Sequence, residues 1–96
     1  MKDQSRPRFG KGVKLRRDSD GGTMLLIPEG ALVLNAPAAA ALALVDGERS
    51  VDEIVAGVVE RFDVTLERAH ADVHELFERL ELRGFILRQA QDDKSE

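Results

Sequence analysis

The most constraining feature of this sequence is a helix whose start and apolar face are both encoded locally. Ser50-Val-Asp-Glu53 matches a capping box, in which the serine oxygen accepts from the amide of Glu53 and the glutamate bonds back to the serine amide. Charged residues occupy the opposite face. The apolar residues recur at the complete helical spacing: Val51, Ile54, Val55, Val58, Val59 and Phe62. The sequence therefore predicts an amphipathic helix over residues 50–62.

Two further helices flank this one. Asn35 is a good N-cap, Pro37 suits a first helical turn, and Asp46-Gly47 offers a left-handed stop, which together predict a short helix. Thr65 can cap a third helix that ends at Gly84. Its apolar stripe is Leu66, Ala69, Val73, Leu76, Phe77 and Leu80.

Short strands are expected before the helices. Val13 and Leu15 alternate with basic residues, and a turn-forming stretch, residues 18–22, follows. Two apolar runs, residues 24–27 and 31–34, are separated by Pro-Glu-Gly, which suits a turn. The fold class predicted is α+β and winged-helix-like: a three-stranded antiparallel β-meander followed by three α-helices. The run Phe85 to Leu87 is expected to fold back over the core as a short strand or a coil.

The chain of 96 residues leaves room for a single domain. We expect a flexible basic arm over residues 1–8, a domain over residues 9–88 and a disordered tail over residues 89–96. The absence of cysteine excludes disulfides, thiolate nucleophiles and cysteine-ligated metals. Because no segment resembles a signal peptide or a membrane span, we expect a cytoplasmic protein.

Charge is divided unevenly along the chain. Residues 1–17 carry a net charge of +6, and the remainder carries −10. A winged-helix DNA-binding regulator is therefore one hypothesis, in which the basic N-terminal segment contacts phosphates. The helix that would enter the groove is itself acidic, which argues against this alternative.

Catalytic and metal-binding patterns are weak. His70 and His74 are spaced i, i+4, as in two-histidine metal sites, but alanine stands where a zinc protease would have glutamate. No pair of carboxylates is singled out for acid–base chemistry, and Ser50 is engaged as a cap. We expect neither an enzyme nor a bound cofactor or metal.

The third predicted strand suggests a binding mode. If residues 31–34 form an uncovered edge, their unpaired backbone groups could accept an extended peptide, and the third helix would supply a groove wall. The same edge could instead stay free, or receive a second copy of the chain as a homodimer.

Taken in order, several segments resemble the D protein family of pyrroloquinoline quinone (PQQ) biosynthesis. The resemblance spans about residues 9–87. Its most specific part is Pro-Glu-Gly at 28–30, followed by Leu34-Asn35 and Asp46-Gly47, and it continues through Ser50 to Ile54, Asp72-Val73 and Gly84-Phe-Ile86. The Ala36-Pro37 pair departs from the pattern that the family often shows after the asparagine.

The resemblance implies a non-catalytic peptide chaperone. Such a protein binds the ribosomally made precursor peptide of PQQ by strand addition and presents it to a radical S-adenosylmethionine (SAM) enzyme, which cross-links a Glu and a Tyr in that peptide. Its partners would be the peptide and this enzyme, with no membrane and no nucleic acid, while the choice between a monomer and a strand-exchanged homodimer stays open. The site residues implied are Ala31, Leu32, Val33, Leu34, Asn35, Arg68, Ala69, Asp72, Val73 and Leu76.

Overall fold

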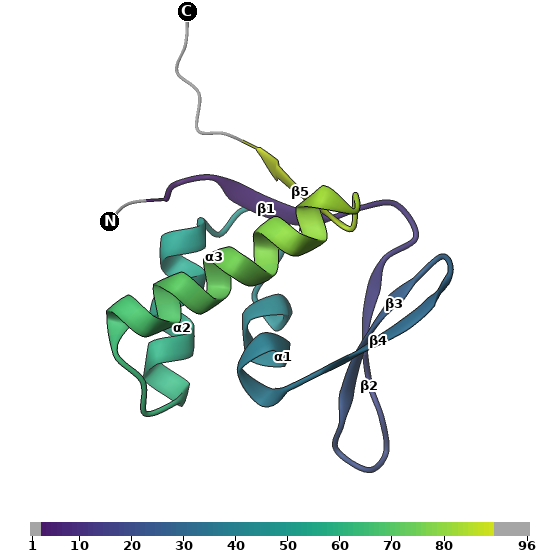
Figure 1. Cartoon of the computed structure of the whole chain (residues 1–96), viewed down its shortest axis with the longest axis horizontal. Helices are drawn as coiled ribbons and strands as arrows, with labels where there is room; N and C mark the ends of the chain where they lie inside the picture. The colour runs from purple at the N-terminus through teal and green to yellow at the C-terminus, as the bar shows by residue number, and fades with distance from the viewer. Residues whose placement is uncertain (1–2, 90–96) are drawn as a thin grey trace, which may run out of the picture.

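The computed structural model describes residues 3–89 of the chain. The predicted fold class is confirmed: a three-stranded antiparallel sheet of order β2-β3-β4 precedes three helices. Figure 1 shows this sheet to one side of the helices, while a second sheet, β1-β5, runs beside α3. The elements are β1 (Arg6–Phe9), β2 (Lys14–Arg17), β3 (Thr23–Ile27), β4 (Gly30–Leu34), α1 (Ala36–Ala43), α2 (Val51–Arg61), α3 (Leu66–Leu82) and β5 (Ile86–Gln89).

All three helices begin at the predicted caps. The side-chain oxygen of Asn35 accepts from the amide of Ala38 at 2.9 Å, and that of Thr65 accepts from the third residue of α3 at 3.1 Å. Both halves of the capping box are present at α2: Glu53 N donates to Ser50 Oγ at 3.1 Å, and Ser50 N donates to Glu53 Oε1 at 2.8 Å. Local sequence signals therefore place the helix starts without help from tertiary contacts.

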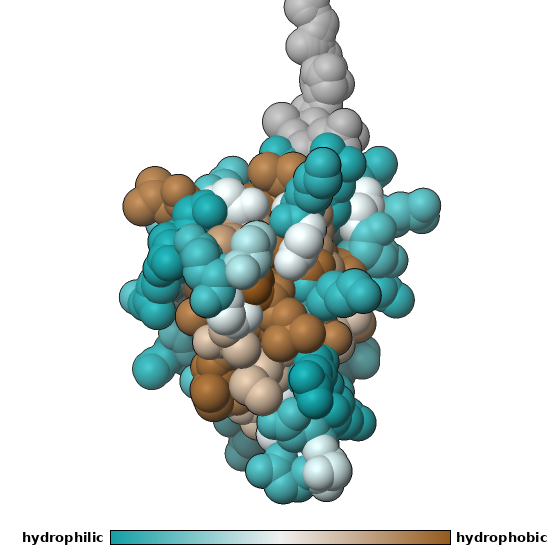
Figure 2. Space-filling view, turned by 90° about the vertical axis from the view of Figure 1, so that its right-hand side faces the viewer, coloured by the Kyte–Doolittle hydropathy of each residue, from teal (hydrophilic) through white to brown (hydrophobic). Residues whose placement is uncertain are grey.

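The meander has apolar side chains on both faces. Leu15, Leu25 and Leu32 lie opposite one another across the three strands, and Leu25 is fully buried. The next rung, Arg16, Met24 and Val33, must face the other way because side chains alternate along a strand. Figure 2 looks onto the side of the molecule where the meander lies and shows hydrophobic side chains gathered within a hydrophilic rim.

Residues 3–8 do not form the flexible basic arm that the sequence predicts. Arg6–Phe9 are strand β1, paired antiparallel with β5 at the other end of the chain. Pro7 is fully buried, and its carbonyl accepts from the amide of Gly47 at 3.0 Å, so this segment is held against the folded domain where a flexible basic arm was predicted. The segment after Gly84 was predicted to be a short strand or a coil, and it forms strand β5. Residues 1–2 and most of the predicted tail lie outside the described residues.

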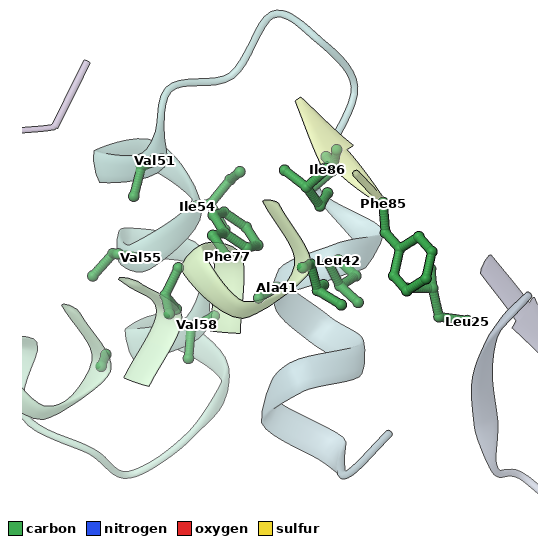
Figure 3. Close-up of a cluster of buried hydrophobic side chains, with 14 of the residues drawn as sticks. Leu25, Ala41, Leu42, Val51, Ile54, Val55, Val58, Phe77, Phe85 and Ile86 are labelled. Carbon is green, nitrogen blue, oxygen red and sulfur yellow. The ribbon is translucent and has the colours of Figure 1, made fainter. Parts of the chain in front are cut away.

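The core lies where the helices meet the inner face of the meander. Figure 3 shows Phe77 of α3 among residues of α2, near Leu42 of α1 and Ile86 of β5, while Phe85 extends toward Leu25. Phe77, Leu42 and Ile86 have no exposed surface. No helix among residues 3–89 is long and apolar enough to cross a membrane.

Candidate functional site

Strand β4 forms one edge of the meander, because the strand order is β2-β3-β4. The amide of Asp18 donates to the carbonyl of Gly22 at 2.7 Å, which makes that rung of β2 and β3 a hydrogen-bonded pair. Hydrogen-bonded pairs alternate along an antiparallel ladder, so Met24 directs its backbone groups toward β2. Its partner Val33 therefore directs its own N–H and C=O toward the open edge.

Ala31 stands two residues away and presents its backbone groups to the same edge, whereas those of Leu32 face β3. Val33 is 85% exposed. No residue from Gly30 to Leu34 is charged. Such an edge lacks the charged or proline residues that usually protect an exposed strand from pairing with another chain.

A hollow of about 340 Å³ adjoins the end of this strand. Asn35, which directly follows β4, lies at its rim, and Ala41, Val58 and Val73 in its lining are buried. The full lining is Asn35, Pro37, Ala38, Ala41, Val58, Phe62, Val64, Ala69, Asp72, Val73, Glu75, Leu76 and Arg79. A segment paired with β4 could therefore continue into an apolar hollow bounded by α1, α2 and α3.

The hollow brings half of the predicted site residues together. Asn35, Ala69, Asp72, Val73 and Leu76 line it, whereas Arg68 and the four predicted residues of β4 do not. Sequence reasoning missed the contributions of α1 and α2. The apolar stripe that begins in α2 contained a usable signal, because it includes the lining residues Val58 and Phe62, but the stripe alone does not say which of its members stay accessible.

The exposed surface of α3 is poorly suited to nucleic acid. Arg68 pairs with Asp72 at 3.2 Å, and Arg79 pairs with Glu75 at 3.1 Å, both one turn apart. These two arginines are therefore offset by carboxylates of the same helix. A groove-reading helix needs free basic donors instead.

The two histidines of α3 are engaged with one another and with the N-terminal segment. Their rings stack with centroids 4.6 Å apart, and His74 Nε2 lies 2.7 Å from Asp3 Oδ2. Arg88 Nη1 contacts the same oxygen at 3.1 Å. No cluster of three histidine, cysteine or acidic residues suited to a metal ion occurs within residues 3–89.

The carboxyl of Asp3, which contacts both His74 and Arg88, has a shifted pKa. Burial raises the pKa of its carboxyl, but hydrogen bonds from the Ser5 hydroxyl and amide and the charges of His74 and Arg88 outweigh burial. The pKa of Asp3 is therefore held below its ordinary value. This carboxylate ties the residues before β1 to α3 and β5 rather than forming part of the hollow.

Two known proteins of the same name are similar to this chain over most of their length. A protein of Rhizobium meliloti named PqqA binding protein is 36% identical over 80 residues, which is 82% of each chain. A protein of the same name from Azotobacter vinelandii is 44% identical over 81 residues, covering 83% of this chain and 87% of its own.

A solved structure shares the fold. It is the solution NMR structure of the PqqD truncation of Methylobacterium extorquens PqqCD, described as a functional and stand-alone recognition element for ribosomally synthesised and post-translationally modified peptides (RiPPs). The two chains superpose with a TM-score of 0.72 at 31% identity, over 85% of this chain and 88% of the other. Residues 22–86 match the family model described as coenzyme PQQ synthesis protein D. The chain therefore belongs to the PqqD family.

Proposed function

We propose that this protein is a non-catalytic peptide chaperone of PQQ biosynthesis, which binds the precursor peptide as an added strand on β4. The observation that carries the proposal is the open, uncharged edge of β4, with the backbone groups of Ala31 and Val33 directed outward next to an apolar hollow. The names of the two PqqA binding proteins and the description of the NMR structure support it.

The binding mode follows from the two parts of the site. Backbone pairing with Ala31 and Val33 would supply affinity with little dependence on sequence, as in other strand-addition complexes. Peptide side chains entering the hollow would supply specificity, through Ala69, Val73 and Leu76 of α3. Arg68 and Asp72 would contribute less to peptide binding, because both side chains are exposed and interactions between exposed charges are worth only about 0–1 kcal/mol.

Presentation of the peptide is the second half of the proposal. The cross-linking chemistry would belong to a radical SAM enzyme, which receives the peptide while it is held on β4. Incubating the purified chain with the peptide alone should leave the peptide mass unchanged, whereas the two proteins and the peptide together should sediment as a ternary complex. Turnover by the chain alone would refute the non-catalytic role.

Self-association is expected to compete with the peptide. An uncharged edge strand accepts a second copy of itself as readily as another extended chain, so the homodimer would use the same backbone groups. Adding peptide should then shift a dimer toward a monomer–peptide complex. A dimer that binds peptide without dissociating would contradict a shared edge.

The direct test is the variant Val33→Pro, with Val33→Thr as the matched control. Proline removes the outward N–H, whereas threonine keeps the N–H, the β-branched shape and the size. Losing one backbone hydrogen bond, with a peptide carbonyl left unpaired, should weaken peptide binding by about 1–3 kcal/mol, roughly 5- to 150-fold in Kd. Unchanged affinity for a folded Val33→Pro variant would refute strand addition at β4.

A further inference from the structure

A second hollow lies on the other side of α1 from the peptide site. Its volume is about 420 Å³, and it is bounded by β2, β3, α1 and the end of α2. Four alanines of α1, at positions 36, 39, 40 and 43, form one side of it at helical spacing. Phe62 lines both hollows. The two sites are therefore neighbours that share one aromatic side chain and are otherwise distinct.

Two arginines give this second hollow its charge. Arg17 ends β2 and Arg61 ends α2, and both residues line the hollow. Neither forms an ion pair with any carboxylate within residues 3–89, although the chain as a whole is acidic. The hydroxyl-bearing Thr23 is also part of the lining, and no acidic residue is.

We propose that this hollow, here named the arginine hollow, binds an acidic polypeptide segment, separate from the one added to β4. Two guanidinium groups supply paired donors for carboxylates, which arginine recognises in a planar, two-pronged geometry. The alanine wall and Phe62 would contact the methylene stems of glutamate side chains. Because phosphate-backbone binding needs many basic contacts and this hollow offers two arginines, a short carboxylate-bearing segment fits better than nucleic acid.

The test uses a hexaglutamate peptide with blocked ends as the probe and a hexaglutamine peptide as the matched control. NMR titration of the full chain should show saturable shifts at residues lining the arginine hollow with hexaglutamate only. Arg17→Gln and Arg61→Gln should each weaken binding about three- to tenfold, because each removes a charge-assisted hydrogen-bond donor. Arg6→Gln, the same change on β1, should leave the affinity unchanged.

Two more variants separate this site from the peptide site. Ala39→Leu should fill the hollow while both arginines remain, and it should also weaken hexaglutamate binding. Val33→Pro should leave hexaglutamate binding intact, even if it abolishes strand addition. The proposal would be overturned if hexaglutamate produced no shifts, if Arg6→Gln weakened binding equally, if binding required Val33, or if duplex DNA bound the same residues more tightly than hexaglutamate.

Discussion

Replacing Asp3 by asparagine should destabilise the protein, because this carboxylate joins the start of the chain to two distant elements. Its Oδ2 atom lies 2.7 Å from His74 Nε2 and 3.1 Å from Arg88 Nη1, and the Asp3 and Arg88 side chains are each only 14% exposed. Hydrogen bonds to charged groups contribute about 1.5–3 kcal/mol when their partners are protected from water. Asparagine keeps one acceptor but loses the charge, so we expect a loss of about 2 kcal/mol, or roughly 10 °C in Tm.

The assay is urea unfolding of the wild type and of Asp3→Asn, near neutral pH and again below the ordinary carboxyl pKa of 3.8. A carboxyl whose folded pKa is lowered stabilises the fold above its unfolded pKa, and this contribution is lost as pH falls through the folded pKa. The difference between the two proteins should therefore be largest near neutral pH and shrink on acidification. Equal stability at neutral pH, or a difference that grows in acid, would refute the role of Asp3. Asp63→Asn, an exposed loop change, is the control.

Two further substitutions test the packing. Gly10→Ala should destabilise the fold by about 1–3 kcal/mol in urea unfolding, because a Cβ there would lie 2.3 Å from the carbonyl oxygen of Gly84. The control Gly22→Ala should have a smaller effect, because its Cβ would meet nothing closer than 3.4 Å. Phe77→Ala should cost about 3–5 kcal/mol, because the ring has no exposed surface, and circular dichroism during thermal unfolding should show a correspondingly lower Tm. Wild-type stability in Gly10→Ala or in Phe77→Ala would contradict the packing described.

The helices were predictable because their signals are local. Ser50, Asn35 and Thr65 each act as a cap within three residues of the amide that they bind. The meander was predictable for a similar reason, since each turn joins strands adjacent in sequence. By contrast, the pairing of β1 with β5 joins residues about eighty positions apart, and Pro7 between two arginines suggested an arm. The residues of β1 alternate between exposed and more buried, so a period-two pattern was present in this segment of the sequence.

The candidate site was predictable only in part. The edge position of β4 follows from the strand order, and four of the six lining residues of α3 came from the family resemblance, which did not include Glu75 and Arg79. The roles of Pro37 and Phe62 depend on how α1 and α2 cross α3, which a helical stripe does not specify. The arginine hollow was also invisible in the sequence, because Arg17 and Arg61 lie on separate elements that only the fold brings together.

The measurement that tests the central claim most directly is amide hydrogen exchange, followed residue by residue with and without the precursor peptide. In the free protein the amides of Ala31 and Val33 face the open edge, whereas that of Leu32 faces β3. Strand addition predicts that peptide binding slows exchange at Ala31 and Val33, while Leu32 is already protected. Saturable peptide binding that leaves exchange at Ala31 and Val33 unchanged would contradict the account.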